Sequence, residues 1–419
     1  MALGRYSRQI RHTYDDYPQQ FWILMGATFI DRLGGALLFP FFTLYVTARY
    51  GVTMTTVGLI FGLFSISSVV GSGIGGALAD RLGRKKMLMF GLVSSATITL
   101  LMGLAPTLSL FLVAAMATGL FADAGGPAQQ AMVADLLPEG KRAEGYGLQR
   151  VVSNLAVVLG PAIGGMLATR SYLSLFIIDA IASTITALIV MRFLDESMPD
   201  RTEAEVHESI WQTFRGYGVA LRDKVMVVFL IASILTVLAY MQMNTTLSVY
   251  LRDYHGIPPQ GFGWLLSMNA AIVVLFQFWV TRQLRGRPRF LMMTLGVLLY
   301  AIGFGMYGLV GSYPMFMVAM VIITIGEMIA VPMSQAIVAR LSPEDMRGRY
   351  MAVYGLSWIL PTALGTLLAG LVIDNFNPNW VWYGASFVCL LAAAIYLGMS
   401  RWVGETEKTT DQRPLTADR

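Results

Sequence analysis

The stretches GPAQQAMVADLLPE (residues 126–139) and VPMSQAIVARLSPE (residues 331–344) align with each other at a constant shift (331 − 126 = 205). Pro, Gln, Ala, Val, Ala, Leu, Pro and Glu coincide within them. The same shift pairs further residues: Arg142 with Arg347, Gly160 with Gly365 and Gly165 with Gly370. An internal repeat of this length predicts that the chain is built from two similar halves.

The composition places the chain in a membrane. Of 419 residues, 56% are hydrophobic and only 13% are charged, which leaves too little polar surface for a soluble protein. The apolar stretches are long enough to cross about 30 Å of hydrocarbon as helices, and they lack the alternation of a β-barrel. The expected spans are 20–48, 54–79, 87–106, 108–136, 143–169, 172–194, 225–251, 260–281, 290–311, 313–341, 348–374 and 380–402.

The repeat and the spans together predict an all-α polytopic membrane protein with 12 transmembrane helices in two six-helix pseudo-symmetric bundles. Six helices separate the repeated segments, so the two halves run parallel, which is a common plan for transporters. The predicted segments are an N-terminal cytoplasmic segment (1–19), a first bundle (20–195), a cytoplasmic linker (196–223), a second bundle (224–402) and a cytoplasmic tail (403–419).

Lys and Arg collect in alternate loops, beginning with the N-terminal segment and the loop at 81–86. Cytoplasmic loops carry such an excess, so we expect a multi-pass protein of the cytoplasmic (inner) membrane with both termini in the cytoplasm. The bases are spread over many loops and form no single patch, which argues against nucleic-acid binding. The single cysteine, Cys389, excludes an intramolecular disulfide and a thiolate metal site, and no metal is expected.

The loop GALADRLGRKKML (residues 76–88) resembles the signature of the major facilitator superfamily. Gly76 lets helices pack closely, Gly83 allows a tight turn, and the bases hold the loop in the cytoplasm. In that family the acidic residue at the position of Asp80 latches the two halves in one conformation. The resemblance therefore implies a conformational latch formed by Gly76, Asp80, Arg81, Gly83, Arg84 and Lys85. Simple positive-inside charge is the alternative explanation, and the corresponding loop of the second half has Gln283 in place of Asp80.

Helix five contains GPAIGG (residues 160–165), which resembles the core of a motif associated with antiporters of this superfamily. The motif residues are Gly160, Pro161, Gly164 and Gly165. Small residues at this spacing allow close helix crossing, so generic packing explains the segment equally well. The chain departs from the family pattern in two places, with Ala156 where the longer motif has glycine and Ala115 where many drug–proton antiporters have arginine.

Three carboxyl groups lie deep in predicted spans, at Asp31, Asp123 and Glu327. Ionisable residues at such depth are costly and usually functional. Each can bind a proton or attract a cation, so we expect Asp31, Arg32, Asp123 and Glu327 to form a proton-coupling and substrate site. The alternative is structural neutralisation by a nearby base, for which Arg32, Arg150 and Arg282 are available. Asp179 lies nearer a helix end and is expected to be solvated or packed.

Polar side chains within the spans are further candidates, because an unpaired amide in hydrocarbon is expensive. They are expected to face a central cavity or another helix. The cavity-lining candidates are Gln149, Arg150, Asn154, Gln242, Asn244, Asn269, Gln277 and Trp358.

Across the whole chain, these features resemble bacterial multidrug exporters of the drug–proton antiporter group. The resemblance implies a monomeric, non-enzymatic secondary transporter that uses no cofactor. It would be driven by the proton gradient and export amphipathic or cationic small molecules by alternating access. A lipid or glycolipid flippase on the same fold stays open as an alternative, as does a non-transporting membrane receptor or scaffold.

Overall fold

The computed structural model describes residues 16–198, 218–343 and 346–411. Within these residues, 12 helices are long and apolar enough to cross a membrane, which confirms the predicted spans. The predicted span 54–79 corresponds to Met54–Leu82, and the predicted span 313–341 to Tyr313–Leu341. Most of the predicted N-terminal segment, most of the linker and the end of the tail lie outside the described residues.

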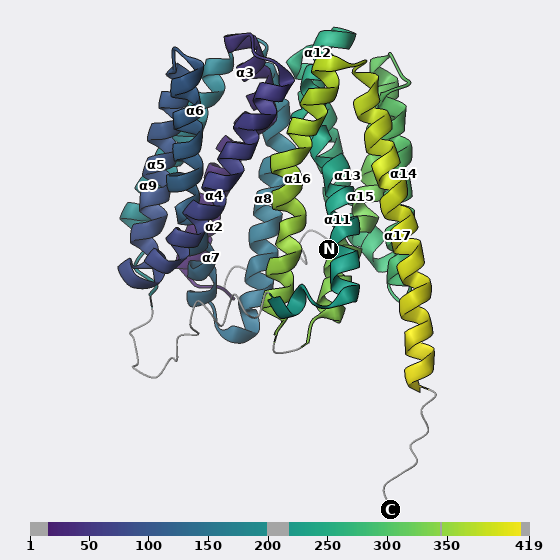
Figure 1. The fold of residues 1–419 in the computed structure, drawn as a ribbon. Coiled ribbons are helices and arrows are strands. Elements are labelled where there is room, and N and C mark those ends of the chain that lie inside the picture. Colours follow the sequence, from purple (N-terminus) through teal and green to yellow (C-terminus); the bar gives the residue numbers. More distant parts are fainter. Residues whose placement is uncertain (1–15, 199–217, 344–345, 412–419) are drawn as a thin grey trace, which may run out of the picture. The chain divides into compact units, whose positions relative to one another are not determined.

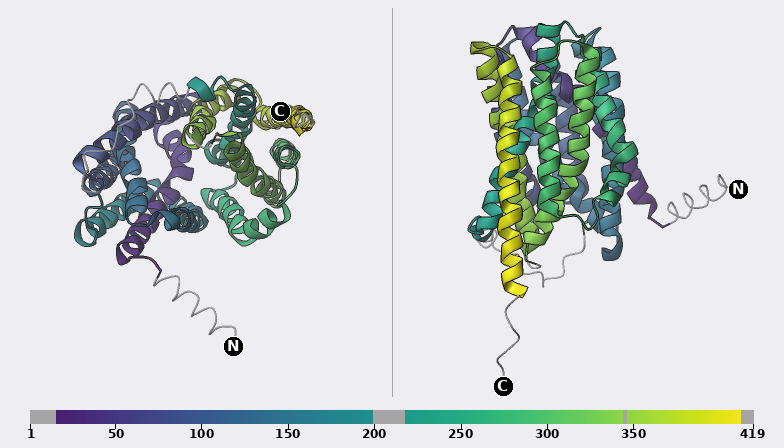
Figure 2. Two further views of the ribbon diagram at one scale, coloured as in Figure 1. Left: turned by 90° about the horizontal axis from the view of Figure 1, so that it is seen from below. Right: turned by 90° about the vertical axis from the view of Figure 1, so that its right-hand side faces the viewer.

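Two compact units make up the chain. Unit 1 consists of Met1–Val52, Ile60–Ala204 and Ile257–Ala270, and unit 2 of Thr53–Leu59, Glu205–Gly256 and Ala271–Arg419. The first residues of α4 (Met54–Leu82) thus belong to unit 2, and the first half of α13 (Pro259–Gln283) to unit 1. Figure 1 and the right view of Figure 2 show the helices along their length, and the left view of Figure 2 shows them end-on.

Unit 1 contains, besides most of α4, the helices α2 (Gln19–Leu38), η1 (Phe39–Phe41), α3 (Phe42–Tyr50), α5 (Arg84–Leu104), α6 (Leu108–Ala117), η2 (Thr118–Ala122), η3 (Asp123–Gly125), α7 (Gly126–Asp135), α8 (Glu139–Ala168) and α9 (Tyr172–Phe193). The first span bends into a 3-10 turn at Pro40, because proline lacks the amide that a continuous helix needs. Helix α2 packs on α8 and α9, and α5 packs on α9.

The fourth span is not the single helix that was predicted for 108–136. It passes through a π-helical turn, η2, and a 3-10 turn, η3, before α7 begins. Neighbouring helices pack closely on this break at glycines, which have no side chain. A Cβ added to Gly75 of α4 would lie only 2.1 Å from the carbonyl oxygen of Ala124, so α4 can approach the break this closely only with glycine there. On α5, a Cβ on Gly91 would lie 2.8 Å from the carbonyl oxygen of Ala122. These close approaches are tertiary contacts that the repeat could not reveal.

Unit 2 contains, besides the second half of α13, the helices α11 (Lys224–Thr245), α12 (Leu247–His255), α14 (Arg289–Tyr307), α15 (Tyr313–Leu341), α16 (Arg347–Asn375) and α17 (Asn379–Asp411). Asp223 starts α11 by accepting from the amides of Val225 and Met226. Helix α14 packs on α15 and α17 (Figure 1). Helix α17 ends at Asp411 and not at 402, so it includes the first part of the predicted tail.

An aromatic core holds one end of unit 2. The rings of Tyr250 and Tyr307 each lie about 5 Å from the ring of Trp382, at 5.2 Å and 5.1 Å between centroids. The Tyr250 hydroxyl also donates to the carbonyl oxygen of Tyr307 over 3.1 Å. Cys389 is fully buried in α17, where it packs as a small core residue.

Candidate functional site

A cavity of about 510 Å³ lies inside unit 1. Four phenylalanines, Phe39, Phe42, Phe61 and Phe64, form its apolar wall, so we call it the aromatic cavity. Its volume falls within the range of small-molecule sites, about 300–1,000 Å³. The polar residues that line it are Asp31, Arg32, Ser95, Thr99, Thr118, Asp123, Ser153, Asp179 and Ser183.

Asp31 and Asp123 both line this cavity, and their predicted role in proton coupling stays a prediction. Asp31 lies on α2, and Asp123 begins the 3-10 turn after the break in the fourth span. Arg32 interacts electrostatically with both carboxyls, so it is the base that partly balances them. The arrangement leaves two acidic groups beside one base and an aromatic wall, which suits a ligand with a positive charge and an apolar body.

Serine hydroxyls support the two carboxyls. Ser183 of α9 donates to Asp31 Oδ1 over 3.1 Å, and Ser95 of α5 lies 3.3 Å from the Ser183 hydroxyl. Ser68 of α4 donates to Asp123 Oδ2. Each carboxyl is therefore oriented by a neighbouring helix, and each keeps one face toward the cavity.

Asp179 is a third carboxyl in the aromatic cavity, and the sequence did not identify it as a site residue. It is only 6% exposed, so of the two environments expected for it, solvated or packed, the structure shows the packed one. Thr99 hydrogen-bonds its side chain. A Cβ on Gly34 would lie 2.7 Å from Asp179 Oδ1, so the absence of a side chain at Gly34 makes room for it. The feature of the sequence that could have indicated this packing is Gly34, which lies on the face of α2 that α9 covers.

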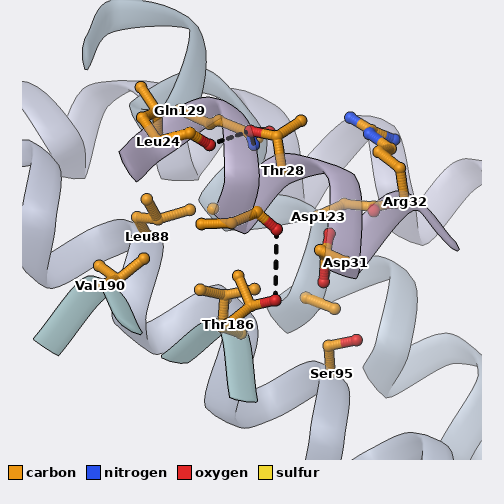
Figure 3. Close-up of a pocket in the computed structure, with 16 residues that line it drawn as sticks. Leu24, Thr28, Asp31, Arg32, Leu88, Ser95, Asp123, Gln129, Thr186 and Val190 are labelled. Atoms are coloured by element: carbon orange, nitrogen blue, oxygen red, sulfur yellow. Dashed lines mark hydrogen bonds between the residues drawn. The ribbon is translucent and has the colours of Figure 1, made fainter. Parts of the chain in front are cut away.

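A second cavity of about 130 Å³ shares Asp31, Arg32, Ser95 and Asp123 with the first (Figure 3). We call it the polar cavity, because Thr28, Gln129 and Thr186 also line it. It reaches the buried residues Leu24, Leu88 and Val190. On α2 it is lined by residues 24–32, whereas Phe39 and Phe42 of the aromatic cavity come later in the same span. The carboxyl pair therefore stands where two chemically different cavities meet.

Glu327 lies in unit 2, on the continuous helix α15. The Tyr240 hydroxyl donates to Glu327 Oε1 over 3.1 Å, and Tyr240 packs edge-on against Trp358. Gln277 donates to the carbonyl oxygen of Met328 and so joins α13 to α15. The predicted residues Glu327, Trp358 and Gln277 thus lie in one unit, and their joint role with Asp31 stays a prediction.

The remaining predicted polar residues have different environments. Gln242 is buried at the α11–α12 break, where it donates to the carbonyl oxygen of Leu238 and accepts from Thr246, so helix termination explains it. Gln149 and Asn269 are buried, Asn154 and Asn244 are half-buried, and Arg150 is exposed. On α8 the aromatic cavity is lined by Ser153 and Val157. A cavity role for Gln149, Arg150, Asn154, Asn244 and Asn269 stays a prediction.

The helix-five motif makes close contacts of the kind predicted for it. A Cβ on Gly160 would lie 2.5 Å from Ala36 Cβ, and one on Gly164 would lie 2.5 Å from the carbonyl oxygen of Leu37. Gly165 faces the first turn of α13, and Pro161 lies within α8 without ending it. Close packing of α8 on α2 accounts for Gly160 and Gly164, and the link of the motif to antiport stays a prediction.

The α4–α5 loop forms a network within unit 1. Arg84 pairs with Asp80 over 2.9 Å and with Asp135 of α7 over 3.2 Å. Glu196 accepts from the Arg84 amide over 2.8 Å. Gly83 has φ +107°, and a Cβ there would lie 2.3 Å from Glu196 Oε2, so glycine is required.

Gly76 does not provide the close helix contact that we expected of it. A Cβ there would lie 3.6 Å from Pro127, an ordinary contact distance. Helix α4 makes its close approach to the fourth span at Gly71 and Gly75 instead, because these residues face the broken segment. The latch between the halves, formed by Asp80 and its neighbours, stays a prediction.

No group of three or more His, Cys, Asp or Glu in the described part of the chain could hold a metal ion. The carboxyls, hydroxyls and aromatic rings of the site can bind a cation and exchange protons. The sequence model of the Major Facilitator Superfamily matches residues 24–287 and 232–417, which together span both halves. The chain belongs to this family.

Its relatives are transporters. The chain is 29% identical over 410 residues to a "Na(+), Li(+), K(+)/H(+) antiporter" of Planococcus maritimus, covering 91% of this chain and 95% of the relative. It is 28% identical over 154 residues to "Quinolone resistance protein NorA" of Staphylococcus aureus, covering 37% of this chain and 39% of the relative. A solved structure of a POT family transporter in complex with 5-aminolevulinic acid has the same fold, with a TM-score of 0.76, 16% identity and coverage of 92% and 97%.

Membership of the major facilitator superfamily confirms the predicted fold of two six-helix bundles and a multi-pass membrane protein. It also confirms that the chain is a secondary transporter and not an enzyme. Antiporters of this family are driven by ion gradients and need no cofactor.

Proposed function

We propose that the chain is a proton-coupled exporter of amphipathic, cationic small molecules. The observation that carries this proposal is the placement of Asp31 and Asp123 beside the phenylalanines of the aromatic cavity. Ionised carboxyls attract the positive charge of a substrate, and aromatic faces add cation–π and apolar contacts. The phenylalanines support broad selectivity, because aromatic rings make apolar contacts that do not depend on the placement of hydrogen-bonding groups on the substrate.

Protons and substrate compete for the same carboxyls in this proposal. A proton on Asp31 or Asp123 removes a negative charge and so weakens binding of a cation. Alternating access then couples outward movement of substrate to inward movement of protons, because each ligand leaves the site ready for the other. Glu327 in unit 2, with its Tyr240 donor, is the other candidate for proton entry.

The proposal includes the setting of the protein. The distribution of Lys and Arg supports a place in the cytoplasmic membrane, with both termini in the cytoplasm. We propose a monomer that contacts membrane lipids, binds no nucleic acid and is driven by the proton gradient without a cofactor.

Transport in proteoliposomes tests the proposal directly. Purified parent protein, Asp31→Asn, Asp123→Asn and Glu327→Gln are compared for efflux of a cationic dye, with and without an imposed proton gradient. We expect gradient-driven efflux in the parent and at least a tenfold loss in Asp31→Asn. Asp253→Asn is the control, because Asp253 is an exposed residue of α12 paired with its neighbour Arg252. Unchanged efflux and unchanged pH dependence in Asp31→Asn would refute the mechanism.

Exchange of alkali cations for protons is a second candidate. It is favoured by the relative named as a Na(+), Li(+), K(+)/H(+) antiporter, which matches nearly full length, whereas the match to NorA covers about a third of the chain. The same vesicles distinguish the two candidates when Na⁺, K⁺ or Li⁺ replaces the dye. A third arm with a fluorescent lipid tests the flippase alternative, for which Asp31 and Arg32 would hold a headgroup.

A further inference from the structure

The polar cavity leads from the carboxyl pair toward one end of unit 1. Asp31 lies 12 residues into α2 (31 − 19 = 12), about 18 Å from the helix start at about 1.5 Å per residue. Leu88 lies four residues into α5 (88 − 84 = 4), about 6 Å from its start. The cavity therefore runs from the carboxyls toward the end of the helices where α2 and α5 begin, and the buried apolar residues Leu24, Leu88 and Val190 lie at its far end.

This cavity has the size and lining of a water site. Its volume of about 130 Å³ exceeds the roughly 10–15 Å³ of probe volume that one water needs. Thr28 donates to the carbonyl oxygen of Leu24, and Gln129 donates to the Thr28 hydroxyl over 2.8 Å (Figure 3). The Gln129 amide oxygen and the Ser95 hydroxyl provide further polar groups along the wall, which a water chain requires.

The walls of the polar cavity exclude an organic substrate. Gly91 and Gly125 bring α5 against the broken fourth span, because a Cβ on Gly91 would lie 2.8 Å from Gly125 Cα. The atoms in contact belong to the helix backbones, so they cannot rotate away to widen the cavity as a side chain could. The volume is also well below the roughly 300 Å³ at which small-molecule sites begin.

We propose that the polar cavity is a hydrated proton pathway, through which Asp31 and Asp123 exchange protons without using the aromatic cavity. This inference rests on the proposed proton coupling. It adds that the proton reaches the carboxyls by a route separate from that of the substrate. A proton moves along the hydrogen bonds of the water chain and is taken up by a carboxylate, and no other bond changes. The charged groups that face the junction are Arg32 of α2 and Asp179 of α9, besides the two carboxyls themselves.

Two isosteric variants test the pathway. Thr28→Val and Gln129→Leu remove polar groups from its wall and keep the volume. Two assays in proteoliposomes separate the steps: dye efflux driven by a proton gradient, and dye-for-dye exchange, which needs no net proton transfer. We expect gradient-driven efflux to fall about tenfold while exchange stays within about twofold of the parent. Thr43→Val is the matched control, since Thr43 is a buried hydroxyl residue of α3 that is 1% exposed.

Cysteine accessibility provides a second measurement. With Cys389→Ala as background, Gln129→Cys is expected to react with a small water-soluble thiol reagent, and Thr43→Cys is not. Two results would overturn the pathway while leaving the proposed function intact, provided that the parent is proton-coupled. One is gradient-driven efflux in Thr28→Val and Gln129→Leu that equals the parent's. The other is a Gln129→Cys that does not react with the reagent. Equal loss of efflux and exchange also overturns it, since the variants would then act on substrate binding. Dye transport without protons in the parent refutes the proposed function itself.

Discussion

At the scale of single residues, Gly34 determines whether Asp179 fits into unit 1. A Cβ at Gly34 would lie 2.7 Å from Asp179 Oδ1 and 2.9 Å from Ala182 Cβ. We expect Gly34→Ala to destabilise the protein, because overpacking costs about 1–3 kcal/mol and the better helix propensity of alanine returns at most about 1 kcal/mol. Heating the purified protein in detergent while recording helical circular dichroism measures the effect.

The neighbouring Gly35 is the matched control. A Cβ there meets nothing within 4 Å, so we expect Gly35→Ala to unfold at the parent temperature or slightly above it. An equal loss of stability in both variants would mean that the helix tolerates no alanine in this segment, and the contact with Asp179 would not be the cause.

The same residues show the limit of the sequence for the site. Asp31 and Asp123 were found because a carboxyl deep in an apolar span is costly wherever its neighbours lie. Asp179 was missed because it is only seven residues into α9 (179 − 172 = 7), and its burial depends on the glycine of another helix. The depth of a residue along its own helix can be read from the sequence. The identity of the residue that packs against it from another helix depends on the tertiary structure.

At the scale of elements, α12 ends at a histidine whose environment predicts a pH effect. The His255 ring lies between Tyr250 and Phe316, at 4.8 Å and 4.9 Å between centroids, and its Nε2 has no hydrogen-bond partner among the described residues. Burial lowers the pKa of the His255 imidazole below its usual value. The unfolded chain then binds the proton more readily, so stability is fully present above about pH 6.5 and decreases as pH falls below it.

The buried thiol of Cys389 provides the measurement, because a thiol-reactive dye becomes fluorescent when unit 2 unfolds. We expect the parent to lose more thermal stability than His255→Phe when the pH is lowered from 7.5 to 5.5. Other groups titrate in the same range, so the contribution of His255 is the difference between the stability loss of the parent and that of His255→Phe. Parallel pH curves would show that His255 is protonated equally well in the folded state.

Helices were easier to predict than the breaks within them. Long apolar runs predict a span. Gly51 and Gly256, both with φ +62°, end helices α3 and α12 in the left-handed conformation that is common at helix C-termini. Besides the first span, which bends at Pro40, the fourth and seventh spans were predicted as single helices and are interrupted. Their breaks depend on close neighbours such as Gly75 and on the Thr246 side chain bonded to Gln242, and neither is visible as a local pattern.

At the scale of the whole molecule, the repeat also relates two helix contacts. In unit 1, a Cβ on Gly165 of α8 would lie 2.9 Å from the carbonyl oxygen of Pro259, at the start of α13. In unit 2, a Cβ on Gly370 of α16 would lie 2.4 Å from the carbonyl oxygen of Met54, at the start of α4. The shift of 205 pairs both members (165 + 205 = 370 and 54 + 205 = 259). The sequence predicted that Gly165 and Gly370 correspond, and the partners of each required the structure.

The two related contacts differ in chemistry, and this difference supports a final prediction. Asp374 of α16 accepts from the amides of Met54 over 3.0 Å and Thr55 over 2.7 Å, which caps the start of α4. Its equivalent Thr169 (169 + 205 = 374) donates instead to the carbonyl oxygen of Gly165 in its own helix. Asp374→Ala leaves two amides unpaired, so we expect a loss of about 1 kcal/mol, whereas Asp374→Asn keeps a good cap. Thr169→Val should change stability less than Asp374→Ala. The Cys389 dye assay measures the two Asp374 variants in unit 2, and helical circular dichroism measures Thr169→Val in unit 1. A melting temperature of Asp374→Ala equal to that of the parent would mean that the cap contributes nothing.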